Sequence, residues 1–435
     1  MASIVVRRSK IRGTLRCPSS KSYTHRAIAI ASLAPSRRSS VITSALLARD
    51  TLATLAACQA FGAEIRHKGS TVEVKGLREL ASPENVVNAE NSGTTIRIAT
   101  AMSGLVKNGH VVLTGDESLR KRPMQPILDT LAQLGVEAFS TKQDGTPPLV
   151  VRGGGIKGGS AVVDGSISSQ FVSGLLIAGV YASSGIDLKI RGNLVSRPYV
   201  GATIATMEKF GVSVGHSEDL LQYQISQAEY RASHFDVPSD FSTAALVMAA
   251  GALVGDRLKI KGLNFGLPQG DAKIVEIMTR MGCSIKADRK RGEVIVGGTD
   301  VLEGGSFNLS DTPDLLPVVS ILALKAKSPV TISGVAHARV KETDRVANIA
   351  SELVKFGARI LEFDDGLRIT APKILKNTSL EAYNDHRLFM AFAIASMMTE
   401  KSVVAGAESV DVSYPNFLSD MKALGARFSS APDRE

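Results

Sequence analysis

The chain has 435 residues, a formal net charge of +9, 44% hydrophobic residues and 21% charged residues. This composition excludes a disordered chain, and the length predicts about two to four domains at roughly 100–200 residues each. No run approaches the roughly 18 consecutive apolar residues of a membrane span, and the first residues lack the apolar region of a signal peptide. The three distant cysteines fit neither a disulfide framework nor a zinc site. We therefore expect a cytoplasmic, reduced protein.

The basic charge balance is compatible with nucleic acid, a membrane surface or small anionic substrates as ligands. Proteins that bind nucleic acid usually cluster their charge and add aromatic side chains for stacking. In this chain Lys and Arg are spread along the sequence, aromatic residues make up 5%, and Trp is absent. We therefore favour small anions.

An amphipathic helix that ends in Gly and leads into a strand recurs six times along the chain. The glycines lie 68–76 residues apart, at Gly62, Gly135, Gly211, Gly282, Gly357 and Gly425. Each lies where the end of a helix needs the left-handed conformation that Gly adopts at little cost. The pattern predicts six units of about 70 residues.

A second helix, rich in small apolar residues, recurs in phase with the first. The six helices are predicted to open at Ser20, Asn91, Ser168, Asp240, Thr312 and Asn384. Helices that are apolar nearly all round belong in a core, and the β-branched runs between them predict strands. We expect an α/β protein with two domains, each of three repeats with buried helices surrounded by sheets.

Cations interrupt these apolar helices close to their N-termini, namely Lys21 with Arg26, Arg97, and His386 with Arg387. Unpaired N–H groups and the dipole make a helix N-terminus favourable for anions and unfavourable for cations. Capping and surface charge alone therefore explain these residues poorly. An anionic ligand held between the helix end and the cations explains them better.

Other signals carry less weight. Residues 153–158 match GxGxxG, but a strand-like run follows where a dinucleotide-binding fold needs a helix. The sequence contains no P-loop motif, and the seven histidines show no metal-binding spacing. His25, inside an apolar helix, is expected in the core or behind the site. We predict neither a cofactor nor a metal.

Three short segments are dense in charged or polar residues: Leu119–Met124, Arg339–Arg345 and Tyr383–Arg387. Together with the helix starts they resemble the 5-enolpyruvylshikimate-3-phosphate (EPSP) synthase family of enolpyruvyl transferases, from about residue 12 to about residue 428. The matching residues are Ser20-Lys21-Ser22 with Arg26, Asn91-Ser92-Gly93-Thr94 with Arg97, Arg122-Pro123, Asp164-Gly165-Ser166, Ser168-Ser169-Gln170, Ser196-Arg197-Pro198-Tyr199, Gln269-Gly270-Asp271, Pro313-Asp314, Arg339 to Arg345 and Tyr383 to Arg387.

The resemblance implies a two-domain inside-out α/β barrel in which each domain has three βαβαββ repeats. Domain 1 would be discontinuous, with residues 1–18 plus 239–435, domain 2 would cover residues 19–238, and the active site would lie in the interdomain cleft. The implied activity is transfer of the enolpyruvyl group of phosphoenolpyruvate to the 5-hydroxyl of 3-phosphoshikimate, the sixth step of chorismate and aromatic amino-acid biosynthesis. The implied enzyme is a cytoplasmic monomer and a target of glyphosate, with these two small molecules and no nucleic acid or membrane as partners.

The resemblance also assigns ligands to residues of this chain. It assigns 3-phosphoshikimate to Lys21, Ser22, Arg26, Ser168, Ser169, Gln170, Ser196, Asp314 and Lys341. It assigns phosphoenolpyruvate to Lys21, Gly93, Arg122, Gln170, Arg345 and Arg387. Further candidates are Asn91, Thr94, Tyr199, Asp240, His337 and His386.

The chemistry explains why these residue types are needed. Attack of a hydroxyl on C2 of the enol ether needs a base, and C3 needs a proton. We expect Asp314 to be the base, Glu342 the acid, and Lys21 a second possible proton donor. Arginine forks suit the carboxylate and phosphate groups of both substrates.

Two positions depart from the family pattern. Val412 stands where the family commonly has a Lys before its C-terminal Ser-aromatic-Pro, so one expected cation is missing. His337 stands where an Asn often lies.

Two alternative functions remain open. UDP-N-acetylglucosamine enolpyruvyl transferase shares the fold, but it has Asn in place of Ser22 and usually a Cys in the loop matching residues 115–124; this chain has no Cys between Cys58 and Cys283. A nucleic-acid-binding or RNA-end-processing βαβαββ protein is the alternative from a different class, motivated by the basic charge.

Overall fold

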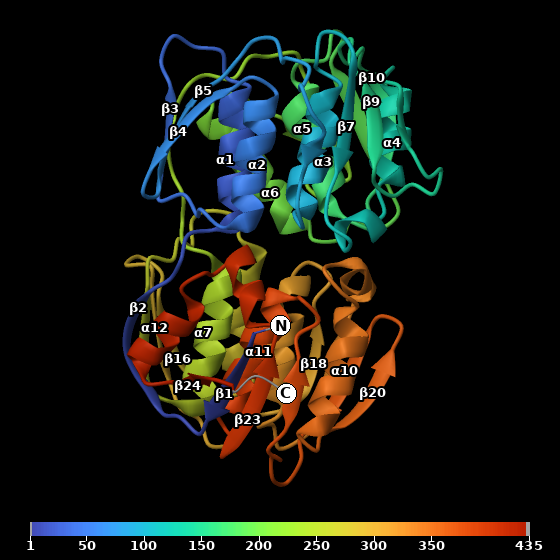
Figure 1. The fold of residues 1–435 in the computed structure, drawn as a ribbon. Helices are drawn as coiled ribbons and strands as arrows, with labels where there is room; N and C mark the ends of the chain where they lie inside the picture. Colours follow the sequence, from blue (N-terminus) through green and yellow to red (C-terminus); the bar gives the residue numbers. More distant parts are fainter. Residues whose placement is uncertain (1, 432–435) are drawn as a thin grey trace. The chain divides into compact units, whose positions relative to one another are not determined.

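The chain forms two compact units in the computed structural model, which describes residues 2–431 (Figure 1). Unit 1 combines the residues up to Pro18 with those from Ser239 onward, and unit 2 runs from Ser19 to Pro238. Among the described residues, no helix has the length and apolar character needed to cross a membrane.

Unit 2 consists of helices enclosed by short strands. Its helices are α1 (Lys21–Ser32), α2 (Arg49–Ala60), α3 (Gly93–Ser103), α4 (Gln125–Gln133), α5 (Ser169–Gly179) and α6 (Arg197–Lys209). Its strands are β3 (Ser40–Thr43), β4 (Glu64–Lys68), β5 (Thr71–Lys75), β6 (Val87–Asn88), β7 (His110–Thr114), β8 (Ala138–Ser140), β9 (Leu149–Arg152), β10 (Gly159–Asp164), β11 (Ile186–Arg191), β12 (Gly215–His216), β13 (Gln222–Ile225) and β14 (His234–Asp236).

Unit 1 is built in the same way. Its helices are α7 (Phe241–Val254), α8 (Ile274–Arg280), α9 (Leu316–Ala323), α10 (Arg345–Lys355), α11 (His386–Ser396) and α12 (Phe417–Leu424). Its strands are β1 (Ser3–Arg7), β2 (Ile11–Arg16), β15 (Gly255–Lys261), β16 (Ser284–Asp288), β17 (Glu293–Gly297), β18 (Gly305–Asn308), β19 (Val330–Ser333), β20 (Arg359–Phe363), β21 (Gly366–Thr370), β22 (Ser379–Glu381), β23 (Lys401–Ala405) and β24 (Arg427–Ser430).

The described strands form six four-stranded sheets, three in each unit, and all six share one topology. Each sheet has a parallel pair at one edge followed by two antiparallel neighbours. In unit 2 the orders are β14-β3-β5-β4, β6-β7-β9-β8 and β10-β11-β13-β12; in unit 1 they are β2-β15-β17-β16, β18-β19-β21-β20 and β22-β23-β1-β24. A parallel pair needs a crossover connection, and the crossover β6–α3–β7 shows that a buried helix supplies it.

The chain crosses between the units at two prolines, Pro18 and Pro238. Within unit 2, the amide of Ser20 donates to the carbonyl of Pro238 at 2.7 Å; within unit 1, the amide of Asp240 donates to the carbonyl of Pro18 at 2.8 Å. The two crossing segments therefore pair with each other. Each leads directly into a buried helix, α1 or α7.

The six glycines of the repeat all have the conformation that the sequence predicts. Their φ angles run from +75° at Gly282 to +114° at Gly425. Each lies just beyond an outer helix, where a left-handed residue lets the chain reverse into the next strand. The prediction of six repeats, each with a left-handed glycine after an outer helix, is confirmed.

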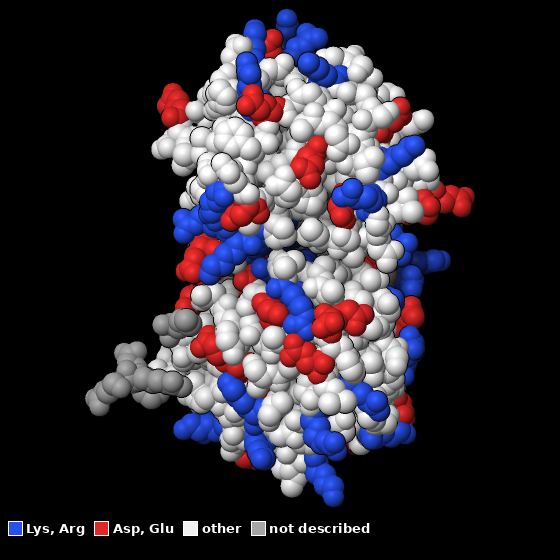
Figure 2. Space-filling view, turned by 90° about the vertical axis from the view of Figure 1, so that its right-hand side faces the viewer, with Lys and Arg blue, Asp and Glu red and all other residues white. Residues whose placement is uncertain are grey.

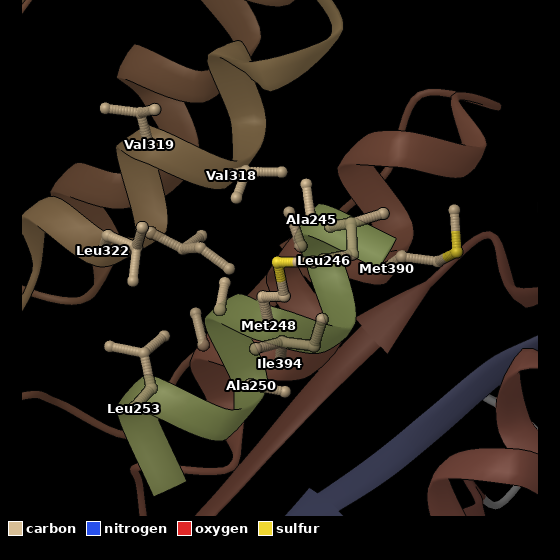
Figure 3. Packing of buried hydrophobic residues seen from close by; sticks show 14 of the residues in the cluster. Ala245, Leu246, Met248, Ala250, Leu253, Val318, Val319, Leu322, Met390 and Ile394 are labelled. Atoms are coloured by element: carbon tan, nitrogen blue, oxygen red, sulfur yellow. The ribbon is translucent and has the colours of Figure 1, made fainter. Parts of the chain in front are cut away.

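The small-residue helices are buried, as predicted. In α7, every residue from Phe241 to Leu253 is buried. Figure 3 shows its side chains packed against α9 and α11, with Met248 from α7, Val318 from α9 and Ile394 from α11 in one cluster. Such a core leaves polar chemistry to the helix ends.

Three predicted helix starts are corrected by the structure. Ser92 and Asp385 are the N-caps of α3 and α11, one residue after Asn91 and Asn384, because their side chains reach the free N–H groups of the first turn. Asn384 instead has a φ of +57° in the preceding turn. A 3-10 turn, Pro313–Leu315, separates Thr312 from α9.

We expect Gly425→Ala to destabilise the protein more than Gly282→Ala. A Cβ at Gly282 would make an ordinary contact of 3.6 Å with Glu303, so the cost is that of the positive φ, about 1 kcal/mol. A Cβ at Gly425 would lie 2.7 Å from the carbonyl oxygen of Lys10, which adds steric strain. Urea unfolding of both variants, which lie in the same unit, measures the difference. Equal losses of stability would contradict this account of Gly425.

Candidate active site

In unit 2, the N-termini of α3 and α5 are joined by one side chain. Gln170, the second residue of α5, donates from Nε2 to Oγ1 of Thr94 at 2.9 Å. Its Oε1 accepts from Nη1 of Arg97 at 2.7 Å. The two buried helices therefore present their first turns to the same place.

Gly93, the first residue of α3, borders two guanidinium groups. A Cβ built on Gly93 would lie 2.8 Å from Nη1 of Arg97 and 3.1 Å from Nη1 of Arg122. Nη2 of Arg122 donates to Oδ1 of Asn91 at 2.7 Å and to Oγ of Ser118 at 3.2 Å, both uncharged groups. Two cations thus lie beside the positive end of a helix, an arrangement that favours an anion.

Lys21, in the first turn of α1, donates to Oδ2 of Asp50 at 2.8 Å. Asp50 lies in the first turn of α2 and is 4% exposed. Asp50 is not among the residues predicted from the sequence, because a lone Asp near a helix start resembles an ordinary cap. The pair fixes the position of the ammonium group.

Arg26 is 1% exposed and connects three helices of unit 2. It donates to the carbonyls of Ser22 at 2.8 Å and Tyr199 at 2.9 Å. It also donates to Thr203 at 2.7 Å and Ser173 at 3.2 Å. Burial lowers its pKa to about 10, so it remains a cation at neutral pH. These contacts hold the start of α1 against α5 and α6.

The three serines predicted to bind the shikimate phosphate begin α5 and α6, which pack together. Ser168 caps α5 and accepts from the amide of Gln170 at 3.3 Å, and Ser169 is buried. Ser196 begins α6 with a φ of +56°, and its side chain makes no cap hydrogen bond. A non-glycine residue held in this region is frequently part of a functional site.

A buried chain of hydrogen bonds lies behind these helix starts. His25 contacts Thr54 at 2.6 Å, Thr54 contacts Thr95 at 2.6 Å, and Thr95 donates to the N-cap Ser92 at 2.7 Å. Burial, with Lys21 and Arg26 nearby, lowers the pKa of His25 well below its usual range. His25 therefore lies behind the site as a neutral group, as the sequence predicts.

In unit 1, the predicted polar residues form what we call the Arg345 cluster: Asp314, Lys341, Glu342, Arg345, Asp385 and Arg387. Arg345 is 1% exposed and donates to three carboxylates. The distances are 2.8 Å to Asp314, 2.7 Å to Glu342 and 2.7 Å to Asp385. Burial alone would lower its pKa, but these carboxylates raise it.

Asp314 is the carboxylate on which the cations of the Arg345 cluster converge. Arg387 donates to its other oxygen at 2.9 Å, and the ammonium of Lys341 lies 4.0 Å away. Burial alone would raise the pKa of Asp314, but Arg387, Lys341 and Arg345 together hold it well below its usual range. In this arrangement Asp314 is a weak base.

Asp271 is a second buried carboxyl group near Asp314, and it is not among the site residues predicted from the sequence. It accepts a short hydrogen bond from Ser242 in the first turn of α7. Burial, together with the charge of Asp314, raises its pKa to about 7. The starts of α7, α9 and α11 thus meet at Asp271, Asp314 and Arg387.

Glu352, also absent from the predicted site, holds the turn that precedes α11. It is fully buried in α10 and accepts from Tyr383 at 2.8 Å and from the amide of Glu381 at 3.0 Å. Lys355 neutralises it at 2.7 Å. Tyr383 and Asn384 both have positive φ, a backbone conformation that needs support from its surroundings. By holding this turn, Glu352 fixes where the next residues, Asp385 and Arg387, lie.

The remaining predicted residues have varied surroundings. Asp240 is occupied as the N-cap of α7, where it accepts from Thr243 at 2.9 Å. His386 is buried in the first turn of α11, and Val412 is buried in a 3-10 turn. Within residues 2–431, no group of three or more His, Cys, Asp or Glu side chains is arranged to hold a metal ion.

His337 is 6% exposed, and its Nε2 has no hydrogen-bond partner among the described residues. Burial, reinforced by Lys341, lowers its pKa to about 4.

We expect His337 to make the protein less stable in mild acid. Below about pH 6.5 the unfolded chain binds a proton on this histidine, whereas the native protein binds it only near pH 4. The free energy of unfolding should therefore fall by about 1–2 kcal/mol between pH 7 and pH 5 for this reason. Urea unfolding of the wild type and of His337→Asn at both pH values isolates this contribution. The same pH dependence in both proteins would contradict it.

Comparisons with known proteins agree with this geometry. The family model for EPSP synthase (3-phosphoshikimate 1-carboxyvinyltransferase) matches residues 5–421. A curated 3-phosphoshikimate 1-carboxyvinyltransferase of Nitrosopumilus maritimus is 47% identical over 97% of this chain and 98% of its own length. One of Methanothrix thermoacetophila is 42% identical over the same shares.

Solved structures give the same result. The EPSP synthase from Acinetobacter baumannii matches with a TM-score of 0.82 and 25% identity, over 99% of this chain and all of that chain. The enolpyruvyl transferase NikO from Streptomyces tendae, at a TM-score of 0.77, 17% identity and the same coverage, shows the fold alone. The predicted fold class and resemblance are confirmed: the chain belongs to the EPSP synthase (3-phosphoshikimate 1-carboxyvinyltransferase) family.

Proposed function

We propose that this chain transfers the enolpyruvyl group of phosphoenolpyruvate to the 5-hydroxyl of 3-phosphoshikimate and releases phosphate, as an enzyme of aromatic amino-acid biosynthesis. Membership of the family over nearly the whole chain supports this reaction. The observation that carries it is the position of Gly93, next to the guanidinium groups of Arg97 and Arg122 at the start of a buried helix. Both substrates carry a phosphate and a carboxylate, which such a site can hold.

Phosphoenolpyruvate binding is proposed for cations of both units. Unit 2 offers Lys21 and Arg122, together with the backbone at Gly93 and the amide of Gln170. These groups lie at the starts of α1, α3 and α5 or in the loop just before α4. Unit 1 offers the two guanidinium groups of the Arg345 cluster, Arg345 and Arg387. Absence of a Lys at Val412 leaves this set one cation short of the family pattern.

For 3-phosphoshikimate, the phosphate is proposed to lie against the hydroxyl groups of Ser168, Ser169 and Ser196. The left-handed turn at Ser196 supports this assignment, because it leaves that hydroxyl free of any cap bond. The ring and carboxylate are proposed to contact Lys21, Ser22, Arg26, Gln170, Asp314 and Lys341. Arg26 also has a positioning role, since its described hydrogen bonds go to protein groups.

The proposed reaction proceeds by addition and then elimination. The 5-hydroxyl oxygen bonds to C2 of phosphoenolpyruvate as C3 takes a proton, and the tetrahedral product then loses a proton from C3 and expels phosphate. Asp314 is proposed to accept the hydroxyl proton. Because Arg345 and Arg387 depress its pKa, Asp314 becomes a useful base only when these cations turn to the anionic substrate.

Two groups are proposed to handle the proton at C3. Glu342 lies 2.7 Å from Arg345, so the same shift of Arg345 toward the substrate would free it to be protonated. Lys21 is the second candidate, and its partner Asp50 keeps the ammonium oriented. Arg122 and Arg387 would stabilise the charge on the departing phosphate.

The alternatives have less support. Ser22 and the absence of Cys between Cys58 and Cys283 argue against UDP-N-acetylglucosamine as acceptor. On the face drawn in Figure 2, basic and acidic side chains are interspersed over both units, whereas nucleic-acid binders concentrate their basic side chains in a patch.

We also propose a cytoplasmic location, in keeping with three buried free cysteines, and a monomer, since one chain supplies every residue named above.

A phosphate-release assay tests the function directly. With phosphoenolpyruvate, the protein should release phosphate when 3-phosphoshikimate is added and not when UDP-N-acetylglucosamine replaces it. Release with the second acceptor alone would establish the rival activity. Release with neither would remove both enzyme assignments.

Asp314→Asn should retain substrate binding and lose most turnover, because the amide keeps the shape of the carboxylate but cannot accept a proton. We expect kcat to fall by about 10²–10⁴-fold, the usual contribution of a general base. Asp411→Asn, at an exposed position of the same unit, is the control and should leave kcat unchanged. A near-normal kcat for Asp314→Asn would exclude Asp314 as the base.

Gly93→Ala should raise the KM for phosphoenolpyruvate, because the new methyl group would crowd Arg97 and Arg122. Glyphosate occupies the phosphoenolpyruvate site in the family and is slightly longer, so its inhibition should weaken more than substrate binding. Steady-state inhibition of both proteins at fixed phosphoenolpyruvate measures this. Gly104→Ala, at the other end of α3, is the control, because its methyl group would mainly meet apolar side chains. Equal inhibition of a clearly sensitive wild type and Gly93→Ala would show that Gly93 does not line the site.

A further inference from the structure

A cavity of about 1020 Å³ lies in unit 1 at the end of the buried helices opposite the Arg345 cluster. Val254 at the end of α7, Leu324 just after α9 and Met397 just after α11 all line it. The first turns of the same helices lie near the Arg345 cluster, so the length of the helices separates the cavity from those residues. None of the residues assigned to the substrates above lines it.

We call this cavity the C-terminal cavity, because it lies at the C-terminal ends of α7, α9 and α11. Its wall is built from hydrogen-bonded backbone. The amide of Ser9 donates to the carbonyl of Met397 at 3.1 Å, and that of Thr299 donates to the carbonyl of Ala252 at 3.0 Å. The ammonium of Lys325 donates to the carbonyl of Leu253 at 3.0 Å. These helix-end carbonyls are therefore already satisfied, and recognition of a ligand falls to the side chains.

The lining of the C-terminal cavity carries more positive than negative charge. Five basic residues line it against two acidic ones: Arg8, Lys10, Lys325, Lys327 and Lys373, with Asp256 and Asp300. Arg8 pairs with Glu400 at 2.9 Å and Lys327 with Glu303 at 2.7 Å. Lys10 and Lys373 have no ion-pair partner among residues 2–431. Asp256 and Asp300 have no ion-pair partner among these residues either, so Lys10, Lys325 and Lys373 leave the lining with an excess of one positive charge to attract an anion.

Apolar side chains supply much of the rest of the lining, and Leu375 and Met398 among them are partly exposed; Ser9 and Thr299 add hydroxyl groups. Met is flexible and polarizable, and it adapts to ligands of irregular shape. The volume is that of a pocket for a metabolite-sized or drug-sized molecule. A simple inorganic ion would leave these apolar groups without a contact.

We propose that the C-terminal cavity binds a small amphipathic anion, with a carboxylate, sulfonate or phosphate head and an aromatic or aliphatic body. Lys10 and Lys373 bind the head, and Leu375 with Met398 packs against the body. The proposal is independent of the proposed function, because it uses residues that the reaction does not.

Titration of the full chain with 8-anilinonaphthalene-1-sulfonate, an amphipathic anion, tests the proposal by fluorescence. Saturating 3-phosphoshikimate is added so that the substrate site cannot contribute. Lys10→Glu/Lys373→Glu should weaken binding at least about tenfold, since two charge-assisted contacts become repulsive. Lys290→Glu/Lys422→Glu, the same charge change at exposed positions of unit 1 outside the cavity, should stay within about twofold of the wild type.

Further arms keep the outcome decisive. Lys10→Gln/Lys373→Gln removes the charges without repulsion and should weaken binding by a smaller factor, which guards against misfolding of the charge-reversed protein. Inorganic sulfate should displace the dye only at far higher concentrations. Absence of a saturable signal, loss of it with 3-phosphoshikimate, equal weakening in the two Glu variants, or displacement by sulfate as readily as by unlabelled naphthalenesulfonate would each overturn the proposal.

Discussion

In each unit, one constraint determines where chemistry can occur: three buried helices each lead into the inner strand of a parallel pair. Two of the three begin at the end of the other strand of that pair, whereas α1 and α7 begin where the chain crosses between the units. This arrangement places the N-termini of α7, α9 and α11 at the same end of unit 1, and the packing between the helices is mostly apolar, although it encloses the hydroxyl groups of Ser320 and Ser396. Contacts at the first turns bear this out, since Arg387 on α11 reaches Asp314 before α9. The helix starts concentrate free N–H groups and positive dipole ends in one place.

The two units neutralise the cations at these helix starts in different ways. In the Arg345 cluster, three carboxylates balance three cations. Removal of the charge of one buried member would leave its partner as an unpaired buried charge, which costs about 3–5 kcal/mol of folding stability. Around Gly93 in unit 2, Arg122 donates to an amide and a hydroxyl oxygen rather than to a carboxylate. Unit 2 therefore retains more positive potential at its helix starts, whereas unit 1 holds a balanced and internally bonded set.

The sequence could predict whatever depends on neighbours along the chain. The six glycines and the apolar helices follow from local conformational and burial preferences, and the structure confirms them. Partners distant in sequence could not be predicted in this way. Lys21 and Asp50 lie 29 residues apart, and Glu352 reaches Tyr383 across 31 residues, so only the packed fold reveals these contacts. Asn384 and Asp385 are both suitable N-cap residues for α11, so the sequence alone does not decide between them. The backbone conformation of the turn makes Asp385 the N-cap.

The bonds within the Arg345 cluster bear on the order of events in the proposed reaction. Arg345 and Arg387 cannot give their best geometry both to Asp314 and to an anionic substrate, because each guanidinium has a limited set of donor directions. When the substrate takes these donors, Asp314 loses two of the three cations that depress its pKa, with Lys341 remaining, and Glu342 loses its pair with Arg345. Base and acid are then released by the same displacement. Phosphoenolpyruvate would in this way activate the groups that act on it, and proton transfer would be suppressed while its site is unfilled.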